Sequence, residues 1–129
     1  MIMNAKKERT VDQGYKFVEM VARKQGWKLN RDEEFLKMLV EGLTKNFNRY
    51  GYYLCPCRDS DGKFEMDKDI VCPCDYAPPD IEEYGHCYCG LYLSPEFWES
   101  KKEPVGIPER RPLNPHEQFK NLFASLSKV

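Results

Sequence analysis

Apolar side chains recur at helical spacing near the start of the chain. Thr10 and Gln13 have the spacing of a capping box, in which each residue satisfies an open backbone group of the other. The apolar residues that follow lie on one helical face: Val11, Tyr15, Val18 and Ala22. This pattern predicts an amphipathic helix that begins at residue 10.

A second helical pattern follows. Asn30 and Glu33 repeat the capping spacing, and Gly51 suits the left-handed residue that commonly ends a helix. The apolar residues between them keep helical spacing: Leu36, Val40, Leu43, Phe47 and Tyr50. We expect two helices within residues 10–51, packed together by these faces.

The helical pattern disappears in residues 52–98, where proline and glycine interrupt the chain and all six cysteines lie. Pro78 and Pro79 predict a short helical turn through Glu83, since proline is tolerated in a first turn. Ser94 and Pro95 predict another brief helix.

Residues 101–113 contain recurring prolines and no periodicity, which indicates an extended strap. Asn114 then has the position of a third helix cap, before apolar residues on one face: Phe119, Leu122, Phe123 and Leu126. The expected fold is mainly α, with helices packed around a loop-rich cysteine centre. We expect one domain over residues 1–129, made of helices (10–51), the cysteine centre (52–98) and a strap with a helix (99–129).

Composition excludes several classes of protein. The 129 residues carry a net charge of −1, without the basic excess of a dedicated nucleic-acid binder. No apolar stretch is long enough to span a membrane, and residues 1–9 lack the apolar core of a signal peptide. We therefore expect a cytoplasmic protein in a reducing compartment, whose cysteines are metal ligands or redox groups.

The six cysteines form three Cys-x-Cys pairs, at residues 55–57, 72–74 and 87–89. Fourteen residues separate the first two pairs and twelve separate the last two. One tetrathiolate site uses four cysteines and leaves two. The count therefore suggests a metal or iron–sulfur centre beside a separate dithiol.

The residues alone allow other ways to divide the six cysteines between sites. Two zinc sites of three cysteines and one histidine would use all six thiols with His86 and His116. One structural zinc with two spare cysteines is a second alternative, although its usual spacing is Cys-x-x-Cys. Three disulfides are disfavoured by the expected compartment. The functional alternative is a zinc-binding interaction module without catalysis.

The order of motifs resembles the catalytic subunit of ferredoxin:thioredoxin reductase. The resemblance covers roughly residues 36–98 and rests on four segments: Val40-Glu41-Gly42-Leu43, Leu54-Cys55-Pro56-Cys57-Arg58, Cys72-Pro73-Cys74, and a final Cys-x-Cys followed by Leu91-Tyr92-Leu93-Ser94-Pro95. The spacing between the pairs departs from the family's usual spacing.

The resemblance implies a role for each cysteine. By position, the ligands of a [4Fe–4S] cluster would be Cys55, Cys72, Cys74 and Cys87. Cys57 and Cys89 would form the redox-active disulfide, with Cys57 as the exposed attacking thiol. Electrons would come from a ferredoxin and pass to a thioredoxin or a glutaredoxin-like protein.

The resemblance also raises expectations about neighbouring residues. The family has a histidine inside the third pair, where this chain has Tyr88; His86, beside Cys87, is the candidate replacement. Arg58 is a candidate to stabilise the Cys57 thiolate. A ferredoxin is typically acidic, so basic side chains of the first two helices or of the strap are candidates to contact it: Lys101, Lys102, Arg110 and Arg111. Whether a second subunit is needed is left open.

Overall fold

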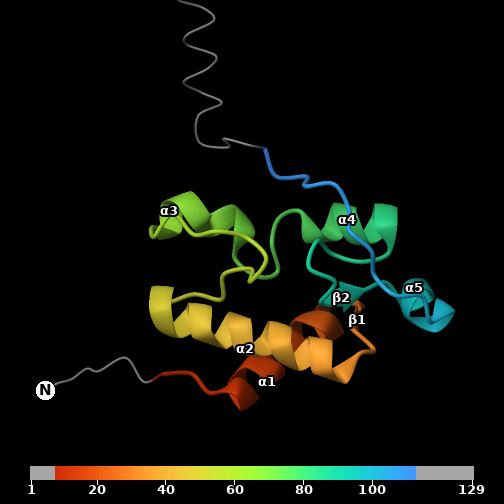
Figure 1. Ribbon diagram of the computed structural model, residues 1–129, viewed down its shortest axis with the longest axis horizontal. Helices are drawn as coiled ribbons and strands as arrows, with labels where there is room; N and C mark the ends of the chain where they lie inside the picture. The colour runs from red at the N-terminus through yellow and green to blue at the C-terminus, as the bar shows by residue number, and fades with distance from the viewer. Residues whose placement is uncertain (1–7, 113–129) are drawn as a thin grey trace, which may run out of the picture.

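The computed structural model describes residues 8–112, and two long helices form its base (Figure 1). Helix α1 covers Val11–Gln25 and helix α2 covers Glu33–Tyr50. The predicted capping box is confirmed, because the Thr10 side chain accepts from the Gln13 N–H while Gln13 caps the Thr10 N–H. Gly51 ends α2 with φ 92°, the left-handed conformation that its missing side chain allows.

The prediction that Asn30 caps the second helix is wrong. Asp32 is the cap, and its carboxylate accepts from the N–H groups of Glu34 and Phe35. The Asn30 side chain accepts from the Asp32 N–H and donates to the Gly90 carbonyl, 60 residues away. The capping spacing selects Asn30, but its side chain is used in a contact with a residue that is distant in sequence.

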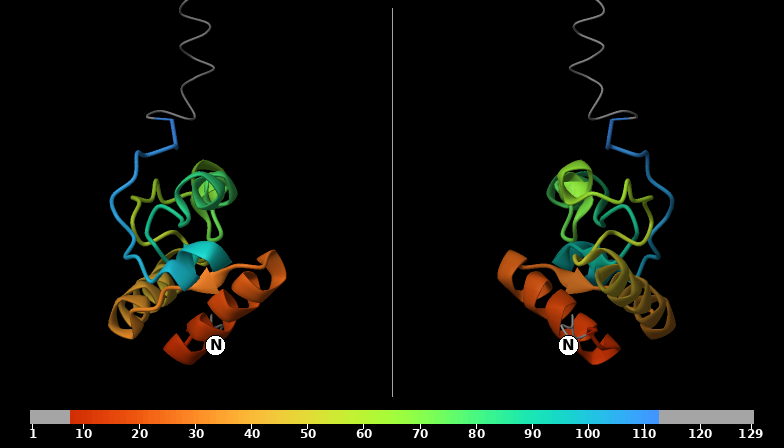
Figure 2. Two further views of the ribbon diagram at one scale, coloured as in Figure 1. Left: turned by 90° about the vertical axis from the view of Figure 1, so that its right-hand side faces the viewer. Right: turned by 90° about the vertical axis from the view of Figure 1, so that its left-hand side faces the viewer.

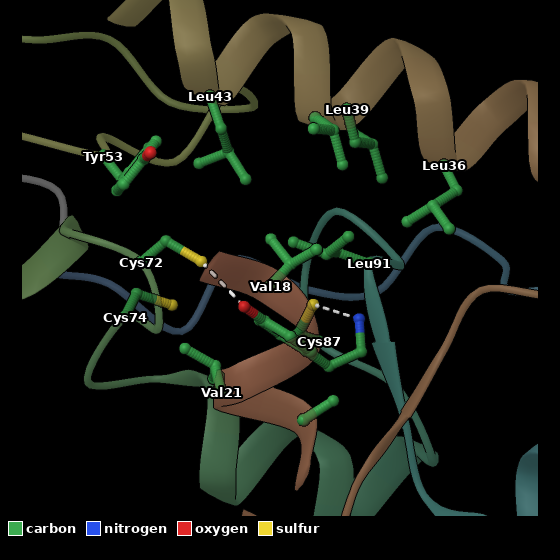
Figure 3. Close-up of a cluster of buried hydrophobic side chains, with 14 of the residues drawn as sticks. Val18, Val21, Leu36, Leu39, Leu43, Tyr53, Cys72, Cys74, Cys87 and Leu91 are labelled. Atoms are coloured by element: carbon green, nitrogen blue, oxygen red, sulfur yellow. Dashed lines mark hydrogen bonds between the residues drawn. The ribbon is translucent and has the colours of Figure 1, made fainter. Parts of the chain in front are cut away.

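The buried core lies between the two helices and the cysteine-bearing loops (Figure 3). Both helices contribute the apolar face expected from their spacing, and its fully or nearly buried members are Val18, Val21, Ala22, Leu36, Leu39, Val40 and Leu43. Later segments complete the core with Tyr53, Leu91 and Tyr92. Three cysteines (72, 74 and 87) belong to this same cluster, so the thiols are part of the hydrophobic core.

Short elements fill the rest of the described chain. Helix α3 covers Phe64–Asp67 and continues into a 3₁₀ turn at Lys68–Ile70. Helix α4 covers Ala77–Tyr84 and helix α5 covers Pro95–Ser100, which confirms the turns expected at the two proline sites. Strand β1 (Lys28–Leu29) pairs antiparallel with β2 (Tyr92–Leu93). The fold is mainly α, as predicted; α3 and the small sheet were not predicted, because each is too short to carry a period.

Residues 101–112 form an extended strap without helix or strand, as the prolines predict. In both views of Figure 2 the strap runs along one flank of the cysteine-bearing loops, leading away from α5. The cap expected at Asn114 and the helix after it lie outside the described residues. Among residues 8–112, no helix has the length and apolar character required to cross a bilayer.

Candidate redox centre

A short antiparallel contact brings the first two cysteine pairs together. The Cys55 N–H donates to the Ile70 carbonyl (3.0 Å), and the Cys72 N–H donates to the Tyr53 carbonyl (2.7 Å). Leu54 and Val71 form an isolated β-bridge between these bonds. The two pairs are therefore fixed side by side, although fourteen residues separate them in the sequence.

Helix α2 packs directly on the first pair. A Cβ atom at Gly42 would lie 3.0 Å from the Cβ atom of Pro56, a tighter contact than most side chains tolerate. Gly42 therefore lets the helix backbone approach the Cys55-Pro56-Cys57 loop. This contact gives a physical reason for the glycine within the segment of residues 40–43.

The third pair is held by a turn against the small sheet. The Cys87 N–H donates to the Tyr92 carbonyl (3.0 Å), and the Gly90 N–H donates back to the Cys87 carbonyl (2.9 Å). Since Tyr92 lies in β2, which pairs with β1 between the two long helices, this turn is fixed to the base of the molecule. Three segments far apart in sequence thus meet at one place.

Burial divides the six thiols, none of which forms a disulfide, into two classes. Four are buried: Cys55, Cys72, Cys74 and Cys87. Cys57 is exposed and Cys89 is half-buried. All but Cys57 line a partly open cavity whose other walls include Ala77 and Leu91. Figure 3 shows Cys72, Cys74 and Cys87 beneath the apolar residues of α2.

The buried sulfur atoms contact hydrogen-bond donors. The Tyr92 backbone N–H donates to Cys87 Sγ (3.3 Å), and the Tyr92 hydroxyl lies 3.3 Å from Cys72 Sγ. Burial raises the pKa of Cys72, and it raises that of Cys74 to about 11. These thiols therefore need a strong positive partner to ionise, which a metal centre supplies when it displaces their protons.

The donor set of the cavity is compatible with an iron–sulfur cluster. Four buried thiols are soft ligands of the kind that bind zinc or iron–sulfur clusters. Within residues 8–112, no three histidine, cysteine or acidic side chains are placed to hold one metal ion together. The chemistry of the four sulfur donors, rather than a ready-made site for one ion, is what supports this compatibility.

Of the remaining two thiols, Cys89 lines the cavity and Cys57 is exposed outside its lining. Hydrogen bonds from the thiols of Cys55 and Cys89 lower the pKa of Cys57 to about 4. Hydrogen bonds to Cys55, Cys57 and Cys87 hold the pKa of Cys89 well above its ordinary value. The pair therefore combines an exposed thiolate with a more sheltered thiol within its reach.

Arg58 faces the buried thiols rather than Cys57 alone. Its Nη1 atom lies 3.4 Å from Cys74 Sγ and 3.7 Å from Cys55 Sγ. Its charge lowers the pKa of Cys57, but the hydrogen bonds with Cys55 and Cys89 have the larger effect. Arg58 is next to Cys57 in sequence, and that adjacency alone pointed to the residue without revealing its contacts.

Arginine–carboxylate pairs attach the strap to this centre. Glu109 accepts from Arg58 through both carboxylate oxygens (2.7 and 2.9 Å), Arg110 pairs with Asp80 and Glu83, and Arg111 pairs with Asp69. No local pattern identifies Glu109, because its partner lies 51 residues earlier. Since Arg110 and Arg111 are committed to these contacts, the exposed Lys101 and Lys102 are the better candidates for an acidic partner among the four strap cations.

His86 lies beneath the strap and is 1% exposed. Its Nδ1 atom is 2.8 Å from the Cys87 carbonyl, and its Nε2 atom accepts from the Val105 N–H at 3.4 Å. Because a carbonyl can only accept, Nδ1 carries the ring proton. Both ring nitrogens thus bond to backbone, and the catalytic role expected for His86 stays a prediction.

Comparisons with known proteins agree on one family. The model of the ferredoxin thioredoxin reductase catalytic beta chain family matches residues 4–110. The chloroplastic ferredoxin-thioredoxin reductase catalytic chain of Spinacia oleracea is 30% identical over 105 residues, covering 81% of this chain and 70% of the relative. The Arabidopsis thaliana chain is 33% identical (69% and 60% covered), and that of Porphyra purpurea is 34% identical (63% and 67% covered).

Proposed function

Because this chain belongs to the ferredoxin thioredoxin reductase catalytic beta chain family, whose members are [4Fe–4S] oxidoreductases acting on disulfides, we propose that it uses electrons from a ferredoxin to reduce the disulfide of a thioredoxin or a similar protein. The observation that carries this proposal is the division of six converging thiols into four buried ones, the half-buried Cys89 and the exposed Cys57. The plant relatives are chloroplastic by name, and the cytoplasmic location expected for this chain stays a prediction.

In this proposal the buried thiols of Cys55, Cys72, Cys74 and Cys87 hold the cluster. Their sulfur donors, their apolar walls and the hydrogen bonds they receive support that assignment. When bound, the cluster supplies electrons one at a time to the neighbouring Cys57–Cys89 disulfide. The wider question of a second subunit is independent of this assignment.

Cys57 is the attacking thiol in the proposed reaction. Its exposure lets it reach the disulfide of another protein, and the Cys89 thiol, whose hydrogen bond lowers the pKa of Cys57, favours its thiolate form. The thiolate attacks one sulfur of the target, which breaks the target disulfide, forms a mixed disulfide and releases the other target sulfur as a thiolate. Cys57 thereby becomes the point of covalent attachment.

Cys89 completes the exchange. Its thiol lies within reach of Cys57 and is sheltered from larger molecules by the cavity. It loses its proton and attacks the Cys57 sulfur, which releases the second target thiolate and leaves a Cys57–Cys89 disulfide. The two electrons of the pair and the Cys89 proton have then passed to the target sulfurs, and two electrons from the donor with one proton from solvent restore the Cys57 thiolate and the Cys89 thiol.

The first experiment measures iron, labile sulfide and zinc after anaerobic purification. About four irons per chain are expected, the content of one [4Fe–4S] cluster. One or two zinc ions without iron, despite ample iron during expression, would instead identify the zinc-binding interaction module.

Two substitutions within one Cys-x-Cys pair test the division of roles. Cys57→Ser should keep the iron and abolish disulfide reduction, whereas Cys55→Ser should impair iron incorporation. Cys89→Ser should keep the iron and accumulate a mixed disulfide between Cys57 and the target, visible by mass spectrometry. Turnover by an iron-loaded Cys57→Ser variant would show that the protein transfers electrons without a thiol cycle.

A further inference from the structure

A single guanidinium joins the strap to the buried thiols. The Arg58 side chain is only 3% exposed, and it uses Nε and Nη2 to hold both carboxylate oxygens of Glu109. The third nitrogen, Nη1, faces the sulfur atoms of Cys74 and Cys55. The cation therefore has a fixed orientation, with one side on the strap and the other on the cavity.

Aromatic rings complete the surroundings of this cation. The Arg58 guanidinium carbon lies 4.5 Å from the centre of the Tyr88 ring and 5.4 Å from that of Tyr76. With little water around it, the charge is weakly screened, and its effect on a neighbouring negative group is larger than at the surface. Ion pairing with Glu109 makes this burial tolerable, because an unpaired buried charge is costly.

We propose that Arg58 is an electrostatic tuning residue, whose fixed positive charge beside Cys55 and Cys74 makes the thiolate-bound redox centre easier to reduce. This inference rests on the proposed function, in which these two cysteines are ligands. Addition of one electron increases the negative charge of the centre by one unit. A cation held against two of its sulfur atoms stabilises the reduced form more than the oxidised form.

The same geometry assigns Glu109 a supporting part. Its bidentate contact fixes the plane of the guanidinium, so that Nη1 rather than the other nitrogens faces the cavity. The Glu109 carboxylate also accepts from the Arg111 N–H at 2.8 Å, which fixes its own position on the strap. The strap therefore orients the Arg58 guanidinium, whose positive charge acts on the redox centre.

The test compares midpoint potentials of the iron-loaded full-length chain and its variants by anaerobic redox titration, followed by visible absorbance and EPR. Arg58→Gln should shift the potential to a more negative value. Arg58→Lys, which keeps a positive charge, should stay closer to the wild-type potential. Arg49→Gln is the matched control, because it removes an exposed arginine from the last turn of α2, outside both the strap and the thiol cavity, and should leave the potential unchanged.

The outcomes separate this inference from the proposed function. Wild-type protein without iron overturns both. Iron-loaded Arg58→Gln at the wild-type potential overturns the inference alone. So does an equal shift in Arg58→Lys and Arg58→Gln, since packing rather than charge would then be responsible. Where Arg58→Gln retains too little iron for titration, Arg58→Met, which preserves the apolar volume without the charge, is measured in its place.

Discussion

The paired helices and the cysteine centre are stabilised in different ways. Helices α1 and α2 are defined by local signals and bury apolar side chains against each other. The cysteine centre has little regular structure, and it is held by backbone bonds between distant segments and by ion pairs with the strap. One region is built for stability, whereas the other holds reactive groups at fixed positions.

This difference matters because the two regions share one buried cluster. Cys72, Cys74 and Cys87 pack against the same apolar side chains that join the helices. The helices therefore provide a rigid wall, and the loops place sulfur atoms against it. Disruption of the wall should affect the whole molecule, whereas disruption of a strap contact should remain local.

The largest expected effect comes from the apolar face of α2 that packs against the cysteine-bearing loops. Leu43 is completely buried where α2 faces the cysteine loops, so Leu43→Ala should lower the free energy of unfolding by about 2–5 kcal/mol through the cavity it leaves. Anaerobic urea denaturation followed by circular dichroism measures this change. Met38→Ala, on the exposed face of the same helix, should change it by less than about 0.5 kcal/mol. Equal losses in the two variants would contradict this account of the core.

A smaller effect is expected where the helices touch. A Cβ atom at Gly14 would lie 2.5 Å from Thr44 Oγ1, and the Thr44 hydroxyl is fixed by its bond to the Val40 carbonyl. Gly14→Ala should therefore cost about 1–3 kcal/mol through overpacking. In a Thr44→Ala background the same substitution should cost less. A double-mutant cycle of urea denaturation measures the coupling, and strict additivity would argue against this contact.

The start of α1 tests a local contribution. Thr10→Ala removes the acceptor that caps the Gln13 N–H and should cost about 1 kcal/mol. Thr10→Ser keeps the oxygen and should retain most of the stability. Thermal unfolding of the three proteins gives the comparison, and a Ser variant as unstable as the Ala variant would exclude capping as the cause.

The strap contributes least, and its contribution should depend on pH. Burial raises the pKa of Asp69, but hydrogen bonds from Arg111 and Tyr76 outweigh it, so the pKa in the folded state is lowered. Asp69 therefore stabilises the folded state above its ordinary pKa of about 3.9, and this stabilisation is lost as the pH falls through the folded value. At pH 7, Asp69→Asn should cost up to about 1 kcal/mol.

Hydrogen exchange shows whether that loss is local. In Asp69→Asn, amides of residues 101–112 should exchange faster while those of α1 keep their protection. In the wild type the same strap amides should lose protection on acidification, and the variant should show less of this pH dependence. Equal acceleration in α1 would mean that the two regions do not differ as described.

The sequence predicted the two paired helices more completely than the contacts of the cysteine centre, for a physical reason. Thr10, Gly51 and the apolar face of each helix act over a few residues, so their pattern is visible along the chain. Asp32 replaced Asn30 as a cap because Asn30 bonds to Gly90, a partner that no local pattern reveals. The Cys-x-Cys pairs identified the candidate centre, since the chemistry requires those residues whatever surrounds them.

Contacts around the thiols could not be predicted in this way. Arg58 was selected for its adjacency to Cys57, but Glu109 directs it toward Cys55 and Cys74. The surroundings of His86 likewise depend on Val105, which belongs to the strap. These arrangements require the folded positions of segments that are distant in sequence.

Because Leu54 and Val71 are joined by a β-bridge, the loop between them should tolerate inserted residues. The hydrogen bonds of this bridge close the loop close to the thiols, and further residues in an already closed loop add little entropic cost. A peptide tag or fluorescent label inserted beside the exposed Gly62 should therefore leave the cysteines where they are. For the same reason, a search for related proteins should let the distance between the first two pairs vary while requiring each Cys-x-Cys unit itself.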